Sequence, residues 1–157
     1  MKLRLVTFTF SDTRTPETDL GGKTLLEELT GAGFAPERHS IVEEELLVIR
    51  ESVRAAAPTC DAIITTGGTG LGPRDVTIAA LDPLFDKRMD GFGEAFRRLS
   101  EADVGARAML SNATAGLIGT TCVFALPGSP KAIPLAVRKL IAPVLEHAVK
   151  IAQGGGH

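Results

Sequence analysis

Residues 60–78 read CDAIITTGGTGLGPRDVTI, and this stretch decides the fold. Its first seven residues are mostly apolar or β-branched, which is typical of a buried strand. Four glycines then fall within the six residues 67–72, and residues 76–85 have the pattern of a short helix. A strand that passes through a glycine turn into a helix is a building unit of a parallel α/β sheet.

The chain repeats this alternation on both sides of the glycine turn. Strands are predicted at 3–10 and 37–42, and residues 120–128 are predicted to form a second strand followed by a glycine turn. Helices are predicted at 23–34, 43–58, 91–105 and 128–153. We expect Pro134 and Pro143 to kink or divide the last helix. The pattern therefore predicts an α/β fold with a mainly parallel sheet.

Composition favours one globular domain with a small molecule or another protein as its partner. Of the 157 residues, 44% are hydrophobic and 23% are charged, close to the average for globular proteins. The net charge is −2 and the chain has no Trp or Tyr, which argues against a nucleic-acid partner. We expect a single domain at 1–153 followed by a flexible tail at 154–157.

No segment predicts a membrane protein or an exported one. No run approaches the roughly 18 apolar residues of a membrane span, and MKLRLVTFTFSD at the start lacks a signal-peptide cleavage site. Cys60 and Cys122 lie in or beside apolar runs without zinc-ligand spacing, so we expect buried thiols. These features predict a cytoplasmic protein.

Two glycine turns, 67–72 and 127–129, follow predicted strands. Ligands of parallel α/β sheets bind at the carboxyl ends of the strands, so we expect both turns at one crevice. Glycines let backbone N–H groups approach an anion, and Arg74 can grip a phosphate. Further hydroxyl donors are Thr65, Thr66 and Thr69. Alternatively, the glycines serve only the turn and Thr77 caps the next helix.

Asp75 follows the glycine loop directly, where an unpaired negative charge opposes phosphate binding. A divalent cation resolves this conflict, because Mg²⁺ is usually held by one or two carboxylates together with substrate phosphates. Asp75 could instead stabilise the next helix through the helix dipole. The sequence favours a metal-binding or catalytic role.

The second turn, LPGSPKA at 126–132, begins the last helix. Ser129 at an N-cap position and Pro130 at the first helical position are explained by capping alone. The same helix start can bind an anion, with Lys131 adding charge. Weaker candidates for the site are Ser11, Asp12, Glu94 and the small residues 111–116. We expect Asp19 to organise its loop and His39, like the other histidines, to be structural or solvated rather than catalytic.

The motifs SDTRTPETDLGG, IITTGGTGLGPRDVT, GFGEAFRRLS, AMLSNATAG and LPGSPKA occur in this order over nearly the whole chain. Together they resemble the MoaB/MogA family of molybdenum cofactor biosynthesis, and TRTPETD looks more like the MoaB branch. The resemblance implies a three-layer α/β/α domain that assembles into trimers or hexamers.

The resemblance also implies an activity. Active members use ATP and Mg²⁺ to attach AMP to the terminal phosphate of molybdopterin, with release of pyrophosphate, and a MoeA-like protein is an implied partner for molybdate insertion. The implied catalytic residues are Asp75, Glu44 and Glu45, with Asp75 and Glu44 as metal ligands. The implied substrate-binding residues are Ser11, Asp12, Thr66, Gly67, Gly68, Thr69, Gly70, Gly72, Arg74, Glu94, Ser111, Pro127, Gly128, Ser129 and Lys131.

Three places depart from the family pattern. Relatives often carry an Asp pair where this chain reads IVEEEL, so Glu44 or Glu45 would replace the metal-binding acid. Ser-Arg is common at 111–112, where this chain reads Ser-Asn, and Pro with an acid is common at 78–79, where it reads Ile-Ala. A second hypothesis is therefore a molybdopterin-binding protein without turnover. A molybdate-inserting domain is less favoured, because such proteins have additional domains.

Overall fold

A computed structural model describes residues 2–156, which fold around one sheet with the strand order β2-β1-β3-β6-β5-β4. The strands are β1 (Leu5–Phe10), β2 (Pro36–Val42), β3 (Ala62–Thr66), β4 (Lys87–Arg88), β5 (Thr114–Ile118) and β6 (Thr121–Leu126). β2, β1, β3 and β6 run parallel, whereas β5 is antiparallel to both of its neighbours. The prediction of a mainly parallel α/β sheet is confirmed.

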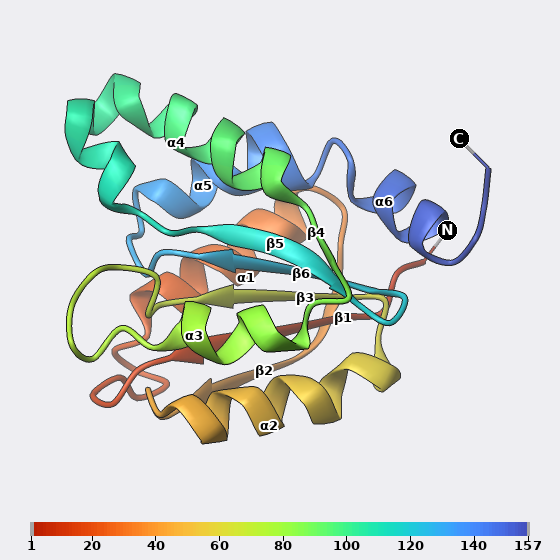
Figure 1. The fold of residues 1–157 in the computed structure, drawn as a ribbon, viewed down its shortest axis with the longest axis horizontal. Helices are drawn as coiled ribbons and strands as arrows, with labels where there is room; N and C mark the ends of the chain where they lie inside the picture. Colours follow the sequence, from red (N-terminus) through yellow and green to blue (C-terminus); the bar gives the residue numbers. More distant parts are fainter. Residues whose placement is uncertain (1, 157) are drawn as a thin grey trace.

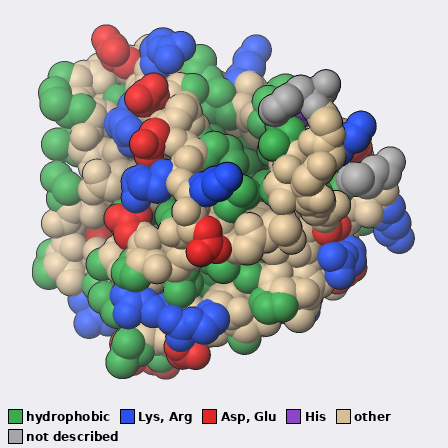
Figure 2. All heavy atoms as spheres, turned by 45° about the vertical axis from the view of Figure 1, so that its right-hand side comes forward, with side chains coloured by type: hydrophobic (Ala, Val, Ile, Leu, Met, Phe, Trp, Pro, Cys, Tyr) green, Lys and Arg blue, Asp and Glu red, His purple; other side chains and the backbone are tan. Residues whose placement is uncertain are grey.

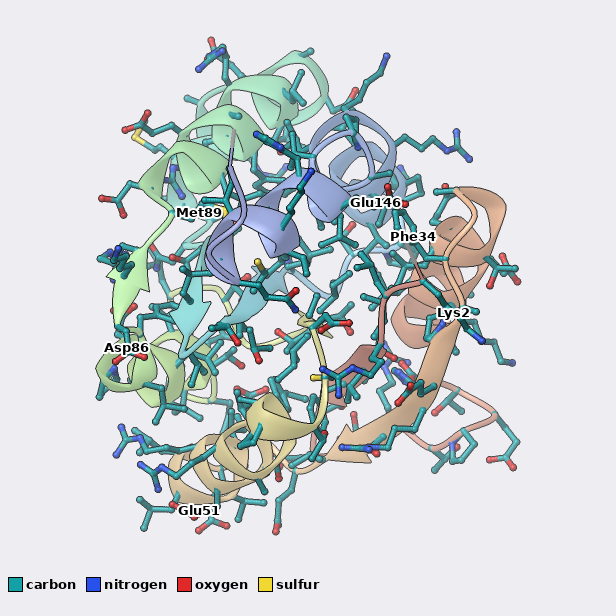
Figure 3. The ribbon with its side chains drawn as sticks, turned by 90° about the vertical axis from the view of Figure 1, so that its right-hand side faces the viewer. Lys2, Phe34, Glu51, Asp86, Met89 and Glu146 are labelled. Carbon is teal, nitrogen blue, oxygen red and sulfur yellow. The ribbon has the colours of Figure 1, made fainter. Side chains whose placement is uncertain are left out.

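Helices cover both faces of the sheet and complete a three-layer α/β/α fold (Figure 1). They are α1 (Leu20–Gly31), α2 (Leu46–Ala56), α3 (Thr77–Leu81), α4 (Asp90–Val104), α5 (Ala132–Ala136) and α6 (Leu145–Ala152). Shorter segments are the 3-10 turns η1 (Ala57–Thr59), η2 (Asp82–Leu84) and η3 (Gly105–Leu110) and the π-helical turn η4 (Val137–Ile141). α1, α4, α5 and α6 share one buried cluster with the sheet, and α2 and α3 share the other. Figure 3 shows Glu51 on α2 and Glu146 on α6 on opposite sides of the sheet.

Strand β1 shows how alternate residues are assigned to the two layers. Val6 and Phe8 pack in the cluster beneath α2, whereas Leu5 packs in the cluster beneath α1. In α1, Leu25 and Leu29 lie one helical turn apart and both are fully buried. Burial of one such side chain is worth about 1.5–3 kcal/mol. Alternate residues of β1 therefore face the two clusters, and the α1 leucines, spaced four residues apart, pack in the same cluster as Leu5.

The predicted helices differ from the structure in their extent, most clearly at α2 and in the last helix. The helix predicted at 43–58 begins at Leu46, because the backbone of Glu45 is extended (φ −134°, ψ 129°). The last helix is divided into α5, η4 and α6, with the break beside Pro143, as predicted. Pro134 lies in the first turn of α5, where a missing N–H removes no helical hydrogen bond, so it does not break the helix.

The sequence reading missed β4 and β5. The small residues 111–116, expected to line a pocket or pack closely against a neighbour, overlap the strand Thr114–Ile118, which lies between β6 and β4. Alanine and glycine are poor strand formers, yet close packing requires them here. A Cβ on Gly116 would lie 2.7 Å from both the Lys87 carbonyl oxygen and the Phe85 ring. The small residues mark a crowded part of the sheet.

The first residues of the tail predicted at 154–157 are hydrogen-bonded to the last turn of α6. The amides of Gly154 and Gly155 donate to the carbonyls of Ile151 (2.9 Å) and Lys150 (2.8 Å). These bonds satisfy carbonyl groups that the last helical turn leaves open. The final residue of the predicted tail, His157, lies outside the described residues.

The topology places the binding crevice at one end of the sheet. From β1 the chain passes through α1 to the edge strand β2, and the next strand, β3, pairs on the other side of β1. Ligands of such sheets bind where the strand order reverses, beyond the carboxyl ends. Figure 1 shows the loops after β1, β3 and β6 gathered at this end, near the last turn of α4.

Candidate functional site

The glycine loop, residues 67–75, leaves the sheet between β1 and β6. Its first amide, on Gly67, donates to the Leu126 carbonyl of β6 at 2.9 Å. Gly67 has φ of 97°, and the Phe10 carbonyl of β1 fills the space that a Cβ would need. Both the left-handed backbone and the close approach require glycine here.

Four consecutive amides of this loop have no hydrogen-bond partner within residues 2–156. No hydrogen bond in residues 2–156 uses the N–H groups of Gly68, Thr69, Gly70 or Leu71. In the same described part of the chain, the amides of Gly128 and Ser129 in the second turn are also unpaired. Unpaired N–H groups that follow strand ends form concavities that bind anions.

Asp75 lies inside the curve of the glycine loop. Its Oδ2 accepts the Gly72 amide at 2.9 Å. A Cβ on Gly70 or Gly72 would lie 2.9 or 2.8 Å from the same oxygen, so the backbone wraps closely around the carboxylate. No hydrogen bond in residues 2–156 uses Oδ1. One oxygen is therefore fixed by the loop and the other is available to a ligand.

Glu44 supports the glycine loop from below and is only 8% exposed. Its Oε1 accepts the Val76 amide at 3.0 Å and lies 3.2 Å from Thr77 Oγ1, which can donate to it. Glu44 therefore caps the start of α3, a role that the sequence suggested for Thr77. Glu44 and Thr77 also fill the space of a side chain at Gly68, whose φ is 74°.

Asp12 joins the loop after β1 to the glycine loop. Its Oδ1 accepts the Glu44 amide at 3.0 Å, and its Oδ2 accepts Nε of Arg74 at 3.1 Å and also Nη2. The hydrogen bond from Arg74 lowers the pKa of the Asp12 carboxyl. The guanidinium that was predicted to grip a phosphate is thus paired with a carboxylate of the protein itself.

Two adjoining cavities open beside the glycine loop. The inner pocket, of about 340 Å³, is lined by residues of both glycine turns, namely Gly68, Thr69, Gly70, Asp75, Pro127 and Gly128. The outer pocket, of about 690 Å³, includes Phe96, Ser129, Lys131 and Leu135. The two pockets share Val104, Arg107, Ser111 and Pro127. The structure therefore brings together most of the residues predicted from the two turns.

A third cavity, the strand-end pocket, has a volume of about 370 Å³ and lies where the two turns meet. Its lining includes Ser11, Thr66, Gly67 and Gly128. A Cβ on Gly128 would lie 3.6 Å from the Gly67 α-carbon, so the two turns touch. Gly128 lines both this cavity and the inner pocket. The contact between the two turns therefore lies between the strand-end pocket and the inner pocket.

A buried chain of polar groups backs the strand-end pocket. The Asp19 carboxylate caps α1 by accepting the Gly22 amide (2.9 Å), accepts the Thr9 hydroxyl (2.9 Å) and lies 2.8 Å from His39 Nε2. Thr9 Oγ1 in turn lies 3.2 Å from Thr66 Oγ1. Burial raises the pKa of Asp19, but the hydrogen bonds from His39, Gly22 and Thr9 outweigh it and hold the pKa below its usual value. The structural roles expected for Asp19 and His39 are confirmed.

Six predicted site residues do not line any of these three pockets: Asp12, Glu44, Gly72 and Arg74, which belong to the glycine loop or contact it, and Glu45 and Glu94, which lie apart from it. Glu94 lines a separate cavity of about 430 Å³, together with Arg88 and Ser111. Glu45 is exposed at the start of α2, and its side chain makes no capping hydrogen bond. Ser111 also lines the inner pocket. Of the two glutamates predicted for catalysis, the structure brings Glu44 to the loop and leaves Glu45 on the surface.

The second glycine turn is held by Ser129. Its Oγ accepts the Lys131 amide at 3.3 Å, and its carbonyl accepts the amides of Ala132 and Ile133 at 3.1 and 3.2 Å. The predicted N-cap position of Ser129 is wrong, because Lys131 is the N-cap of α5 and makes no side-chain cap bond; Ser129 holds the turn ahead of the helix instead. The α-helix begins later than predicted, at Ala132, so Pro130 lies in the turn ahead of it.

The carboxylates near the loop can be tested for a fit to Mg²⁺. In residues 2–156, no three His, Cys, Asp or Glu side chains form a metal-binding cluster. Mg²⁺ needs only one or two protein carboxylates when substrate phosphates complete its shell. Burial raises the pKa of Glu44, and the charges of Asp75 and Asp12 raise it further. A divalent cation would offset this repulsion, so Asp75 and Glu44 fit a metal that binds with phosphate.

Sequence reasoning missed Arg107, which lines both the inner and the outer pocket. Gly105, with φ of 63°, ends α4 and begins the turn η3 that carries this arginine. The chain then returns to the glycine loop, where the Asn112 amide donates to the Thr69 carbonyl at 3.0 Å. No sequence pattern near Arg107 indicates a role at the site, because its position beside the glycine loop depends on the return of the chain to that loop after η3.

The surface charges are mixed. On the face drawn in Figure 2, Lys and Arg side chains intermix with Asp and Glu, in keeping with the net charge of −2. None of the helices within residues 2–156 has the length and apolar character needed to cross a bilayer.

Comparisons with known proteins identify the family. Residues 7–147 match the family model described as "Probable molybdopterin binding domain". Molybdenum cofactor biosynthesis protein B of Staphylococcus carnosus is 49% identical over 152 residues, which cover 94% of this chain and 89% of that protein. The protein of the same name from Bacillus subtilis is 46% identical over 151 residues, with the same coverage of 94% and 89%.

Solved structures agree with the sequence comparisons. A crystal structure of a molybdenum cofactor biosynthesis protein B matches with a TM-score of 0.93 at 42% identity and covers 98% of both chains. The tungsten cofactor synthesizing protein MoaB from Pyrococcus furiosus matches with a TM-score of 0.85 at 33% identity, over 97% of this chain and 98% of that one. The chain belongs to the molybdenum cofactor biosynthesis family that includes the MoaB and MogA proteins.

Proposed function

We propose that this protein is a Mg²⁺- and ATP-dependent adenylyltransferase that acts on molybdopterin. An oxygen of the terminal phosphate of molybdopterin attacks the α-phosphorus of ATP and forms a new P–O bond. The bond from the α-phosphorus to the oxygen that bridges it to the β-phosphorus breaks, and pyrophosphate leaves with that electron pair. AMP is thereby joined to molybdopterin.

The observation that carries this proposal is the row of free amides at 68–71 beside Asp75. A phosphate nucleophile is already ionised near pH 7, since its second pKa is about 6, so it needs no neighbouring base. The main obstacle is the repulsion between two polyanions. Fixed N–H donors suit that task because they are oriented before the charges meet.

Each part of the site has a role in this reaction. The loop amides and Lys131 bind phosphoryl oxygens, and Asp75 and Glu44 are the carboxylates that would hold Mg²⁺. When bound, Mg²⁺ neutralises phosphate charge and stabilises the leaving pyrophosphate. The inner and strand-end pockets meet at Gly128 and give room for two substrates.

Assembly into trimers or hexamers, and transfer of the product to a MoeA-like protein, remain predictions from the family resemblance. Exposed apolar side chains on η3 favour a contact between subunits. Met109 is 71% exposed and Leu110 is 52% exposed. Measurement of the mass in solution tests the assembly, and a monomer would contradict it.

The activity is tested by incubating the protein with molybdopterin, Mg²⁺ and ATP and measuring pyrophosphate release. We expect release that requires all three, together with adenylylated molybdopterin as the product. Tight molybdopterin binding without release would reject the enzyme and favour the second hypothesis, a non-catalytic molybdopterin-binding protein. Absence of both binding and release would reject both functions.

A further inference from the structure

Arg74, the cation that the sequence predicted for phosphate binding, does not line the inner pocket. Arg74 is paired with Asp12 instead. The ionisable groups contributed by the glycine loop and its support, Asp75 and Glu44, are acidic. A positive side chain from another part of the fold would therefore strengthen phosphate binding at the free amides. Lys131, which binds phosphoryl oxygens in the proposed function, lines the outer pocket and not the inner one.

Arg107 supplies a positive charge on the wall that faces the glycine loop. It lines the inner pocket together with Asp75 and also lines the outer pocket. In residues 2–156, none of the ion pairs and side-chain hydrogen bonds uses its guanidinium. Arg97 of α4, by contrast, donates to the carbonyls of Ser111 and Ala113, each at 3.2 Å.

The backbone around Arg107 is anchored although its side chain is free. Ala108, the next residue, is 6% exposed and belongs to the buried part of η3. The segment after η3 is tied to α4 by Arg97 and to the glycine loop by the bond from Asn112 to Thr69. The guanidinium therefore extends from a fixed point beside the pocket and is unpaired within the described chain.

We propose that Arg107 binds the phosphoryl oxygens of the substrate in the inner pocket, opposite the free amides of the glycine loop. A guanidinium can bind two such oxygens at once through a planar pair of N–H donors, which a lysine cannot do. This inference rests on the proposed function. The phosphoryl group belongs either to the triphosphate of ATP or to the terminal phosphate of molybdopterin.

The test compares Arg107→Ala and Arg107→Lys with the wild type and with the control Arg98→Ala. Arg98 is an exposed arginine of α4 that does not line the inner or the outer pocket. Calorimetric titration with Mg²⁺ and α,β-methylene-ATP, and separately with pyrophosphate, measures phosphate binding without turnover. Steady-state rates give KM for molybdopterin and for ATP. Melting temperatures report folding.

We expect Arg107→Ala to weaken phosphate binding by about tenfold, Arg107→Lys to weaken it less, and Arg98→Ala to match the wild type. All four proteins should melt alike. Weaker titration with the nucleotide assigns the ATP triphosphate, whereas unchanged titration with a raised KM for molybdopterin assigns the pterin phosphate.

Two results overturn the inference and are distinguishable. If the wild type releases pyrophosphate and Arg107→Ala equals it in every titration and in both KM values, Arg107 has no such role and the proposed function stands. If the wild type neither binds the probes nor releases pyrophosphate, the proposed function fails and the role of Arg107 fails with it. A lower melting temperature for Arg107→Ala, matched by its loss of binding, would show a structural role instead.

Discussion

The carboxylate of Glu44 accepts the backbone N–H of Val76 at 3.0 Å, across 32 residues of sequence. This bond fixes the end of the glycine loop from below, while Asp12 holds the amide of Glu44 itself at 3.0 Å. The loops after three parallel strands are thus joined into one unit beneath the free amides. The following predictions test separate parts of that unit.

Substitutions of Glu44 separate its structural role from its metal role. Glu44→Ala removes the cap of α3, so we expect a loss of about 0.5–2 kcal/mol in the free energy of unfolding. Glu44→Gln keeps an acceptor of the same shape but removes the charge. We expect it to melt near the wild type and to need more Mg²⁺ for half-maximal activity. An unchanged Mg²⁺ requirement in Glu44→Gln would limit Glu44 to supporting the loop.

Substitution of Asp75 tests the charge inside the loop. Asp75→Asn keeps an acceptor for the Gly72 amide and removes the negative charge. We expect adenylylation to fall by roughly 100-fold or more, with little change in melting temperature because Asp75 is exposed. Unfolding of the variant would show a structural role instead, and a wild-type rate would remove Asp75 from the reaction.

The left-handed turn at Gly68 makes a prediction about stability. Gly68→Ala places a side chain at φ of 74° where Thr77 and Glu44 leave no room. We expect a loss of about 1–3 kcal/mol from the backbone conformation, with further loss from the contacts, measured by urea unfolding. Gly91→Ala is the control, because a Cβ on Gly91 in α4 meets nothing within 4 Å. Alanine there should leave stability equal or slightly higher.

Asp61 makes a prediction about pH. It accepts the Arg4 amide and Gln153 Nε2, both at 2.9 Å. Burial raises its pKa, but the hydrogen bonds and charge of Arg4 outweigh this and hold the pKa below its usual value. A carboxyl with a lowered pKa in the folded state stabilises the fold above its unfolded pKa of about 3.9. That stabilisation disappears as the pH falls through the folded pKa.

The comparison is between the wild type and Asp61→Asn, melted at several pH values. We expect the wild type to be more stable near neutral pH and the difference to shrink as the pH falls below about 4. A difference that stays constant down to pH 3 would show that the ionised carboxylate of Asp61 adds nothing to stability.

Local patterns allowed much of the fold to be predicted. The β-branched and aromatic residues of β1 and the leucine spacing in α1 are local patterns, so both elements can be predicted from the sequence. β5 could not be predicted in this way, because Gly116 reflects the nearby backbone of Lys87 rather than strand propensity. The start of α2 was misplaced for a similar reason, since Glu44 is drawn into the site by contacts with Val76.

The motifs of the candidate site could be predicted from the sequence, but the contacts between residues far apart in the chain could not. The glycine turns and Asp75 follow strands, and the sheet topology brings them together. The pairing of Arg74 with Asp12 spans 62 residues, and no pattern in the sequence marks it. Arg107 reaches the pocket only because the chain returns to Thr69 after η3. Such long-range contacts determine which arginine side chains are paired within the protein and which can bind a ligand.

The central claim is that the free amides at 68–71 bind phosphoryl oxygens beside Asp75. A crystal structure with molybdopterin, Mg²⁺ and α,β-methylene-ATP tests it most directly, through the distances from these amide nitrogens to the nearest phosphoryl oxygens. We expect at least two distances of about 2.7–3.2 Å, with the metal between phosphate and Asp75. Ligands seated elsewhere, with these amides far from any phosphate, would contradict the account.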